Sequence, residues 1–429
     1  MTGSKQKKQK GISIEEIAKK AYDAKDSIAN AGISVKLNVL KSVKGNLIRD
    51  KKEIIRQNFL DIDSAKKDGL SKPMIDRLTI SDKVFNSMIK SIEDVEKIKD
   101  PVGGIEEVTI RPNGLKVGRM RIPLGVIGII YESRPNVTIE ASILCILSGN
   151  AVVLRGGSEA LRSNIILGKV ISKSLEESGI SPDVVSMVPT KERTAVKELI
   201  LQKKYIDLII PRGGEGLISF VTENSKIPVI KHDKGVCHIY VDENADIKKS
   251  IEVVLNAKAQ RPSVCNALET LLVHREIMGK FIPPLFTELR KKGVELRVDG
   301  EILKAFKKKF DFLVPAKERD WDEEYLNLIL AVKSVKDMDQ AIGHIKKHGS
   351  DHTESILTED YGNAMEFIKK VNSSCVLVNA STRFNDGYEL GLGAEIGIST
   401  SKIHAFGPMG ARELTTTKFV VLGNYQVRS

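Results

Sequence analysis

The sequence predicts an α/β protein with two α/β domains. From residue 123 onward, short apolar runs alternate with segments whose apolar residues recur at helical spacing. Several of the short runs are apolar at every position, which is typical of strands buried on both faces of a parallel sheet. Glycine-rich turns follow two of these runs. Repeated strand–helix units predict parallel sheets covered by helices, and at about 150 residues per domain the chain has room for two or three domains.

The N-terminal part of the chain, up to residue 99, is predicted to be helical. Ser13 is a candidate N-cap for a helix with apolar residues at helical spacing, and Pro73 interrupts a second helical region. The pattern then changes to two alternating runs on either side of Asn113-Gly114, which predicts a β-hairpin. This hairpin is either an arm used in assembly or an ordinary surface hairpin, since exposed sheet edges have to be covered in some way.

Strand and helix signals alternate through the rest of the chain in two series. In the first, strands are expected at residues 126–131, 151–154, 184–188 and 206–210, and helices at 140–148, 161–178, 191–201 and from 217. In the second, strands are expected at 238–241, 271–273, 326–332, 354–357, 375–378 and 419–422, and helices at 247–257, 276–291, 338–348 and 361–371. Ligands bind parallel sheets at the carboxyl ends of the strands, so the turns there are candidate sites.

Cys265 is a candidate nucleophile. It follows a short polar turn and precedes an apolar run, so a loop that enters packed structure would make its thiol both reachable and fixed. Only the thiolate is a nucleophile, and its surroundings set the thiol pKa. Burial in the core is the alternative, because free cysteines are among the most buried residues. The four cysteines lie far apart without a CxxC pair, which predicts neither a metal site nor a disulfide framework and fits a reducing cytoplasm.

Two glycine-rich turns are candidate cofactor sites. Backbone N–H groups at a helix start, with a cation beside them, suit a phosphate or a ribose. Neither turn has the GxGxxG or P-loop pattern, so a plain turn is the alternative for each. Equivalent positions in one sheet favour the cofactor interpretation. The residues concerned are Arg155, Gly156, Gly157, Ser158 and Glu159 in the first turn and Gly213 and Gly214 in the second.

Arg134 and Asn136 follow the first buried strand of the first series. The amide of Asn136 can serve as an oxyanion donor in a cleft, or it can cap the next helix. Arg134 can hold a carboxylate or a phosphate through a forked pair of hydrogen bonds.

Composition argues against several classes of partner. The net charge is +11, but aromatic residues make up only 5% of the chain, which speaks against a nucleic-acid platform. The positive field instead suits an anionic substrate or cofactor. The lysine-rich first ten residues have no apolar segment of a signal peptide, and we find no run of about 20 apolar residues that would span a membrane. A cytoplasmic protein is expected.

Several of these motifs together resemble the aldehyde dehydrogenase superfamily, and within it the branch that reduces an acyl phosphate. The resemblance runs from about residue 14 to the C-terminus, and its most specific stretches are residues 123–136, 148–160, 264–273 and 391–402. It implies two Rossmann-like α/β domains with a small β-hairpin oligomerisation arm. The implied parts are a basic leader (1–10), an NADP-binding domain (11–104 and 123–231), an arm with a C-terminal strand (105–122 and 405–429) and a catalytic domain (232–404).

The resemblance also implies an activity, which is the NADPH-dependent reduction of L-glutamate 5-phosphate to L-glutamate 5-semialdehyde. Cys265 would be the catalytic thiol, and Asn136 with the backbone N–H of Cys265 would form the oxyanion hole. A homodimer or homotetramer is expected. The alternatives are a hydrolytic aldehyde dehydrogenase, a coenzyme-A-acylating one, and a member of the fold without activity.

The implied cofactor is NADP(H). Arg155 stands near the family's lysine that contacts the adenosine ribose, and as a permanent cation it is a candidate for the extra phosphate of NADP. Gly213 and Gly214 fall at the turn that meets the pyrophosphate. Glu324 aligns with the acid that contacts the nicotinamide ribose, although the surrounding motif differs.

One departure from the family pattern concerns water activation. Hydrolytic aldehyde dehydrogenases carry a glutamate base upstream of the cysteine, and the matching position here holds His232, 33 residues before Cys265. A reductase of acyl phosphates needs no water attack on its thioester, so a strong base there would waste the intermediate. His232 either helps proton transfer or positions the loop. For the phosphate and α-carboxylate of the substrate, the candidate cations are Arg134, Arg261 and Arg383.

Overall fold

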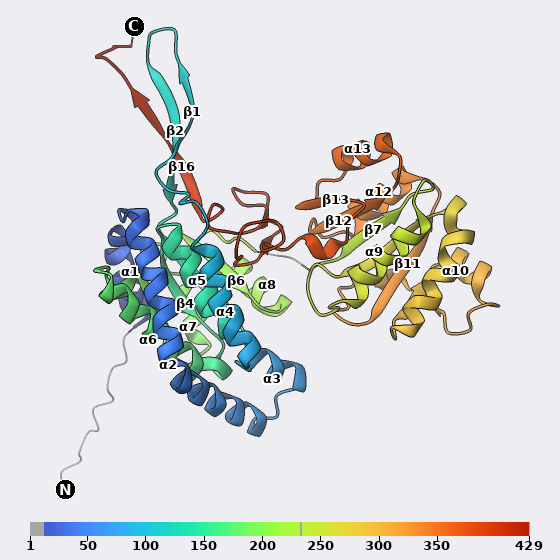
Figure 1. Ribbon diagram of the computed structural model, residues 1–429, viewed down its shortest axis with the longest axis horizontal. Coiled ribbons are helices and arrows are strands. Elements are labelled where there is room, and N and C mark those ends of the chain that lie inside the picture. The colour runs from blue at the N-terminus through green and yellow to red at the C-terminus, as the bar shows by residue number, and fades with distance from the viewer. Residues whose placement is uncertain (1–12, 232–233, 429) are drawn as a thin grey trace. The chain divides into compact units, whose positions relative to one another are not determined.

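The structure, a computed structural model, describes residues 13–231 and 234–428. These residues form two compact units (Figure 1). Unit 1 takes the described residues within Met1–Lys231, Leu392–Gly397 and Met409–Ser429, and unit 2 those within His232–Gly391 and Ile398–Pro408. Each unit contains its own parallel sheet, which confirms the predicted α/β class.

Unit 1 begins with the predicted helices, α1 (Ile14–Ala29), α2 (Ile33–Lys67), α3 (Lys72–Leu78) and α4 (Asp82–Val95). Ser13 caps α1 as expected: its hydroxyl accepts a hydrogen bond from the N–H of Glu16, and the Glu16 carboxylate accepts one from the N–H of Ser13. This capping box satisfies two backbone donors that the helix itself cannot pair.

The predicted hairpin is present as β1 (Ile105–Ile110) and β2 (Lys116–Pro123), which pair antiparallel. Asn113 accepts a hydrogen bond from the N–H of Leu115, and Gly114 adopts a φ of +87° that suits glycine. The chain returns about 300 residues later as β16 (Thr415–Leu422), which pairs antiparallel with the other edge of β2 (Figure 1). A role of this three-stranded sheet in assembly stays a prediction.

The parallel sheet of unit 1 has the order β5-β4-β3-β6, so β3 lies between β4 and β6. Its strands are β3 (Val126–Tyr131), β4 (Ala151–Arg155), β5 (Val185–Met187) and β6 (Leu208–Arg212), and its helices are α5 (Asn136–Leu147), α6 (Leu161–Glu177), α7 (Thr194–Leu199) and α8 (Glu215–Asn224). Every residue of β3 is buried, as expected for a continuous apolar run. The strand order brings the segments after β3, β4 and β6 to one edge of the sheet.

Unit 2 holds a parallel sheet of order β10-β9-β11-β8-β7-β12-β13. The strands are β7 (Cys237–Val241), β8 (Leu268–His274), β9 (Glu295–Val298), β10 (Val314–Pro315), β11 (Ile329–Val335), β12 (Thr353–Leu357) and β13 (Cys375–Val378). The helices are α9 (Ile247–Ala259), α10 (Arg275–Lys291), α11 (Gly300–Phe306), α12 (Met338–His348) and α13 (Tyr361–Lys370). A separate pair, β14 (Ile398–Ser399) and β15 (Gly407–Pro408), is antiparallel.

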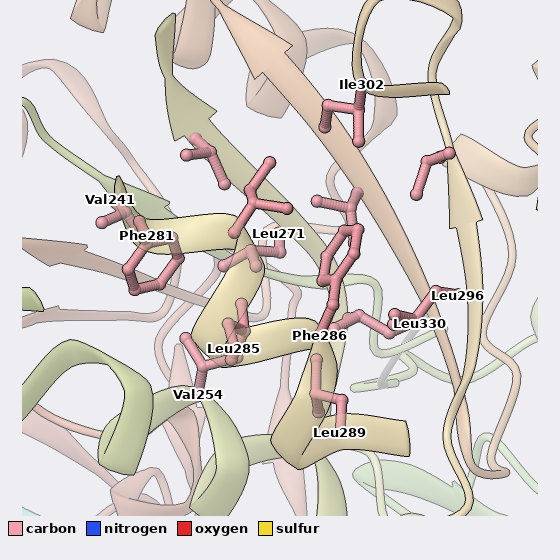
Figure 2. Close-up of a cluster of buried hydrophobic side chains, with 14 of the residues drawn as sticks. Val241, Val254, Leu271, Phe281, Leu285, Phe286, Leu289, Leu296, Ile302 and Leu330 are labelled. Atoms are coloured by element: carbon pink, nitrogen blue, oxygen red, sulfur yellow. The ribbon is translucent and has the colours of Figure 1, made fainter. Parts of the chain in front are cut away.

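The main core of unit 2 lies between this sheet and α9 and α10. Figure 2 shows the cluster, in which Phe281, Leu285, Phe286 and Leu289 of α10 gather with Val254 of α9, Leu271 of β8, Leu296 of β9 and Leu330 of β11. All of these side chains are fully buried. Burying one such side chain contributes about 1.5–3 kcal/mol, which makes the strands beside Cys265 a rigid support.

Several boundaries differ from the sequence-based expectation. The strand expected at 326–332 is β11, which starts three residues later because Leu326 turns the chain at a φ of +50°. Helix α5 begins at Asn136, not at residue 140, because Pro135 already starts the helix. The helix expected at 191–201 is shorter than predicted and comprises only α7 (Thr194–Leu199). Strands β9 and β10 were not predicted because they are short. No helix within the described residues is long and apolar enough to cross a membrane.

Candidate functional site

The sequence motifs of unit 1 meet at the carboxyl edge of its sheet. Ser133, just after β3, donates to the Glu159 carboxylate through its N–H at 2.8 Å and through its hydroxyl at 2.5 Å. Glu132, its neighbour, accepts a hydrogen bond of 2.9 Å from the N–H of Gly214. The segment after β3 therefore holds both predicted glycine turns, one on each side.

Arg155 ends β4 and is almost fully buried. Its Nη1 donates to the carbonyl of Gly156 at 3.0 Å, and its Nη2 donates to the carbonyl of Glu192 at 3.3 Å. Its Nε has no hydrogen-bond partner among the described residues. Burial lowers the pKa of Arg155, and the nearby charge of Glu159 opposes that shift. A buried cation with an unused donor suits a phosphate oxygen.

Three glycines in the two predicted turns have no space for a side chain. A Cβ at Gly156 would collide with the amide of Asn164, and one at Gly157 would collide with the Glu159 carboxylate. A Cβ at Gly213 would lie 2.6 Å from the carboxylate carbon of Glu132. Neighbouring side chains thus pack against the main chain at these positions. Dinucleotides bind at glycine-rich turns at the carboxyl ends of parallel strands, so the residues present fit such a cofactor.

Asn136 is the first residue of α5, and the cap residue is Pro135. The amide is therefore not a helix cap, which removes that alternative. Its Nδ2 donates a hydrogen bond of 3.0 Å to the carboxylate of Glu140, one helical turn further on. Arg134 is exposed, and its charge acts on Glu140. The structure thus brings Arg134 and Asn136 beside an acid that the sequence analysis did not select.

In unit 2, Cys265 lies in a turn between α9 and β8 and is partly exposed, so the core alternative is wrong. Its carbonyl accepts a hydrogen bond of 3.1 Å from the buried thiol of Cys237. The side-chain amide of the next residue, Asn266, donates a hydrogen bond of 2.9 Å to the carbonyl of Asn385. A Cβ at Gly235 would collide with the carbonyl of Cys265. The turn is fixed from several sides while the residue at its tip keeps contact with solvent.

Two of the three candidate arginines accompany Cys265 in unit 2. Arg383 donates from Nε to the side chain of Gln260 at 2.9 Å, and Gln260 precedes Arg261. Burial lowers the pKa of Arg383, the charge of Asp386 opposes this shift, the charge of Arg261 adds to it, and Cys265 opposes it. The three groups are therefore close enough to influence one another, which is an arrangement suited to an anionic acyl substrate.

Glu324 lies beside an ion pair that the sequence analysis missed. Nζ of Lys258 is 2.5 Å from the carboxylate of Glu269, and both side chains are fully buried. Burial raises the pKa of Glu269 to about 8 and lowers that of Lys258, and the charge of Glu324 acts on both. The N–H of Leu326 also donates to Glu269, at 3.3 Å. The sequence signal was a charged residue, Glu269, close before the apolar run 271–273.

The segment that would carry a hydrolytic base is only partly described. His232 lies outside the described residues, so its role stays a prediction.

The chain is similar to known proteins over nearly its whole length. Residues 4–302 match the Aldehyde dehydrogenase family. The chain is 54% identical over 419 residues to the gamma-glutamyl phosphate reductase of Desulfatibacillum aliphaticivorans, covering 97% of this chain and 99% of that one. It is 51% identical over 415 residues to the protein of the same name from Thermodesulfovibrio yellowstonii, covering 96% and 98%.

Solved structures of related proteins show the same similarity. The crystal structure of gamma-glutamyl phosphate reductase from Thermotoga maritima matches with a TM-score of 0.94 at 48% identity, over 97% of this chain and all of that one. An acetylating aldehyde dehydrogenase from Geobacillus thermoglucosidasius matches with a TM-score of 0.70 at 17% identity, over 97% of each chain, which supports the fold alone.

Proposed function

The chain belongs to the aldehyde dehydrogenase family, and we propose that it reduces L-glutamate 5-phosphate to L-glutamate 5-semialdehyde with NADPH and releases phosphate. This reaction is the second step of proline biosynthesis from glutamate. The observation that carries the proposal is the partly exposed Cys265 thiol, held in a fixed turn with Arg261 and Arg383 close by. Relatives more than 50% identical over their full length carry the name of this activity.

The first half of the proposed reaction is acyl transfer to sulfur. The Cys265 thiolate attacks the acyl carbon and forms a carbon–sulfur bond, the bond between that carbon and the phosphate oxygen breaks, and the released phosphate takes its proton from solvent. The amide of Asn136 and the backbone N–H of Cys265 donate to the oxyanion. Losing one such donor typically costs about 3 kcal/mol of transition-state stabilisation.

The substrate carries two anionic groups, the acyl phosphate and the α-carboxylate. In this proposal Arg261 and Arg383 bind the substrate group nearest Cys265, because Arg261 and Cys265 both act electrostatically on Arg383. Arg134 is the further candidate. Arginine suits both groups because its planar fork can bind two oxygens at once.

The second half of the proposed reaction requires a dinucleotide, and bound NADPH supplies a hydride. Arg155, with its unused buried Nε, would hold the phosphate that distinguishes NADP from NAD. Gly156, Gly157, Ser158, Glu159, Gly213 and Gly214 would line the path of the adenosine and pyrophosphate. Glu324 would hold the nicotinamide ribose. After reduction, the carbon–sulfur bond breaks and Cys265 leaves as thiolate, which regenerates the nucleophile.

The proposal includes a cytoplasmic homo-oligomer without nucleic-acid or membrane partners. The domain assignment is part of it: dinucleotide binding in the first α/β domain and covalent chemistry in the second. His232 would not activate water, since the thioester has to survive until it is reduced.

The test is run in the oxidative direction, with glutamate 5-semialdehyde and NADP⁺. Reduction of NADP⁺ should require inorganic phosphate or arsenate. Turnover without either would identify a hydrolytic aldehyde dehydrogenase, and turnover with coenzyme A in place of phosphate would identify an acylating one. No turnover under any condition would favour a member of the fold without activity.

A further inference from the structure

Helix α5 carries one charged residue in its whole length, Glu140. Residues 141–147 are all buried, and only Asn136, Val137 and Glu140 keep partial contact with solvent. A carboxylate on such a helix loses hydration without gaining apolar packing, so it requires compensating partners. Its partner is therefore a clue to its role.

The partner is the amide of Asn136. Its Nδ2 lies 3.0 Å from Oε1 of Glu140, and the two residues are one helical turn apart on the same face. An asparagine amide has two N–H groups and one oxygen, and a carboxylate can accept only from the N–H side. The hydrogen bond therefore sets which end of the amide faces Glu140 and leaves the second N–H pointing elsewhere.

Burial and nearby charges both act on the carboxyl group of Glu140. Burial raises its pKa, and the hydrogen bond from Asn136 together with the charges of Arg212 and Arg134 opposes that rise. Arg212 itself is packed against the main chain at Gly397, where any Cβ would collide with its guanidinium. Removing Arg212 or enlarging Gly397 would thus disturb the field at Glu140.

We propose that Glu140 is a positioning residue: its carboxylate orients the Asn136 amide so that the second N–H is presented to the oxyanion of the acyl-transfer step. The inference rests on the proposed function, in which Asn136 is that donor. It assigns a role to an acid that the sequence motifs did not single out, and it places this acid behind the donor and away from the reacting atoms.

The experiment is a double-mutant cycle with Glu140→Leu and Asn136→Ala. Two rates are followed, acylation of Cys265 by 4-nitrophenyl acetate and phosphate-dependent oxidation of glutamate 5-semialdehyde. Each single variant should lose about 100-fold in acylation rate, the scale of one oxyanion donor. The KM for NADP⁺ and the rate of thiol alkylation by iodoacetamide should change by less than about twofold, because neither needs the oxyanion donor. Glu140→Gln, which keeps an acceptor oxygen, should restore most of the loss.

The double variant decides between positioning and a general structural effect. If Glu140 acts through Asn136, then adding Glu140→Leu to Asn136→Ala should cost less than about twofold more. The inference would be overturned if the fold losses of the two single variants multiply in the double variant, or if Glu140→Leu keeps the wild-type rate. An equal loss in the control Glu176→Leu, at an exposed position, would also overturn it. The ester assay keeps the test independent of the natural substrate: wild-type acylation without turnover of the semialdehyde would contradict only the proposed function.

Discussion

The buried thiol of Cys237 donates a hydrogen bond of 3.1 Å to the backbone carbonyl of Cys265. Gly235, two residues before Cys237, lies so close to the same carbonyl that a Cβ there would collide with it. The main chain of the nucleophile turn is therefore held by the segment that leads into β7. The position of the Cys265 turn therefore depends on Gly235 having no side chain.

Gly235→Ala should displace this turn and lower kcat. A displacement of about 1 Å at a reacting group can cost around 100-fold in rate, so a loss of at least tenfold is expected. The matched control is Gly279→Ala in α10, where a Cβ would meet nothing within 4 Å. That change should leave kcat unaltered and raise stability by about 0.5–1 kcal/mol. Wild-type kcat in Gly235→Ala would show that the turn tolerates the displacement.

The buried pair of Lys258 and Glu269 predicts an asymmetry in stability. Lys258→Met leaves a carboxylate buried without its cation, which should destabilise the protein by about 3–5 kcal/mol. The double change with Glu269→Leu removes both charges and should recover most of that loss. Urea unfolding, monitored by circular dichroism, measures the free energy of unfolding of the single and the double variant. Equal losses in the single and the double variant would argue that packing, not charge pairing, dominates at this site.

The histidines of α12 predict a pH dependence of stability. His344 is buried against Trp321 and His238, and burial lowers its pKa from 6.5 to about 2, with the charges of His238 and His348 adding to the effect. In the unfolded chain His344 therefore takes up a proton near pH 6.5, whereas in the folded chain it stays neutral at that pH. Stability is lost as pH falls below 6.5. The loss from this group should reach about 2 kcal/mol at pH 5.

His344→Gln should remove this contribution. The difference in unfolding free energy between pH 7 and pH 5 should be about 2 kcal/mol smaller in the variant than in the wild type. An unchanged difference would mean that His344 titrates normally in the folded protein.

Arg155 is expected to control the choice between NADP and NAD. Arg155→Met should weaken binding of 2′,5′-ADP, which carries the distinguishing phosphate, by at least tenfold, and should change binding of 5′-AMP by less than threefold. Calorimetry on the intact enzyme measures both. Arg162→Gln, which removes a cation on α6 that pairs with Asp61, is the control. An equal loss for both nucleotides would assign Arg155 a structural role only.

Much of the fold was predictable because its signals are local. Every position of β3 is apolar, and the strand is fully buried; Asn113-Gly114 closes the hairpin as predicted. The shift of β11 came from the backbone of Leu326, whose positive φ has no sequence signature in a leucine. The pairing of β16 with β2 joins segments about 300 residues apart, so no local pattern could establish it.

Sequence motifs select candidate site residues, whose roles stay predictions, whereas residues that act through tertiary contacts have no such motif. Cys265 and Asn136 were selected from their motifs, whereas Glu140 and the pair of Lys258 and Glu269 gain their meaning only from what surrounds them. Glu140 stands out in hindsight as the lone charge of an apolar helix. Arg212 gave no signal, because an arginine at the end of a strand is common.

The central claim is covalent catalysis by Cys265, and Cys265→Ser tests it most directly. The measurement compares the variant and the wild type in phosphate-dependent NADP⁺ reduction with glutamate 5-semialdehyde, after circular dichroism has shown that the variant is folded. A hydroxyl at this position is far less ionised than a thiol, so the rate should fall by at least about 1000-fold. A variant that retains a rate near that of the wild type would contradict the thioester mechanism.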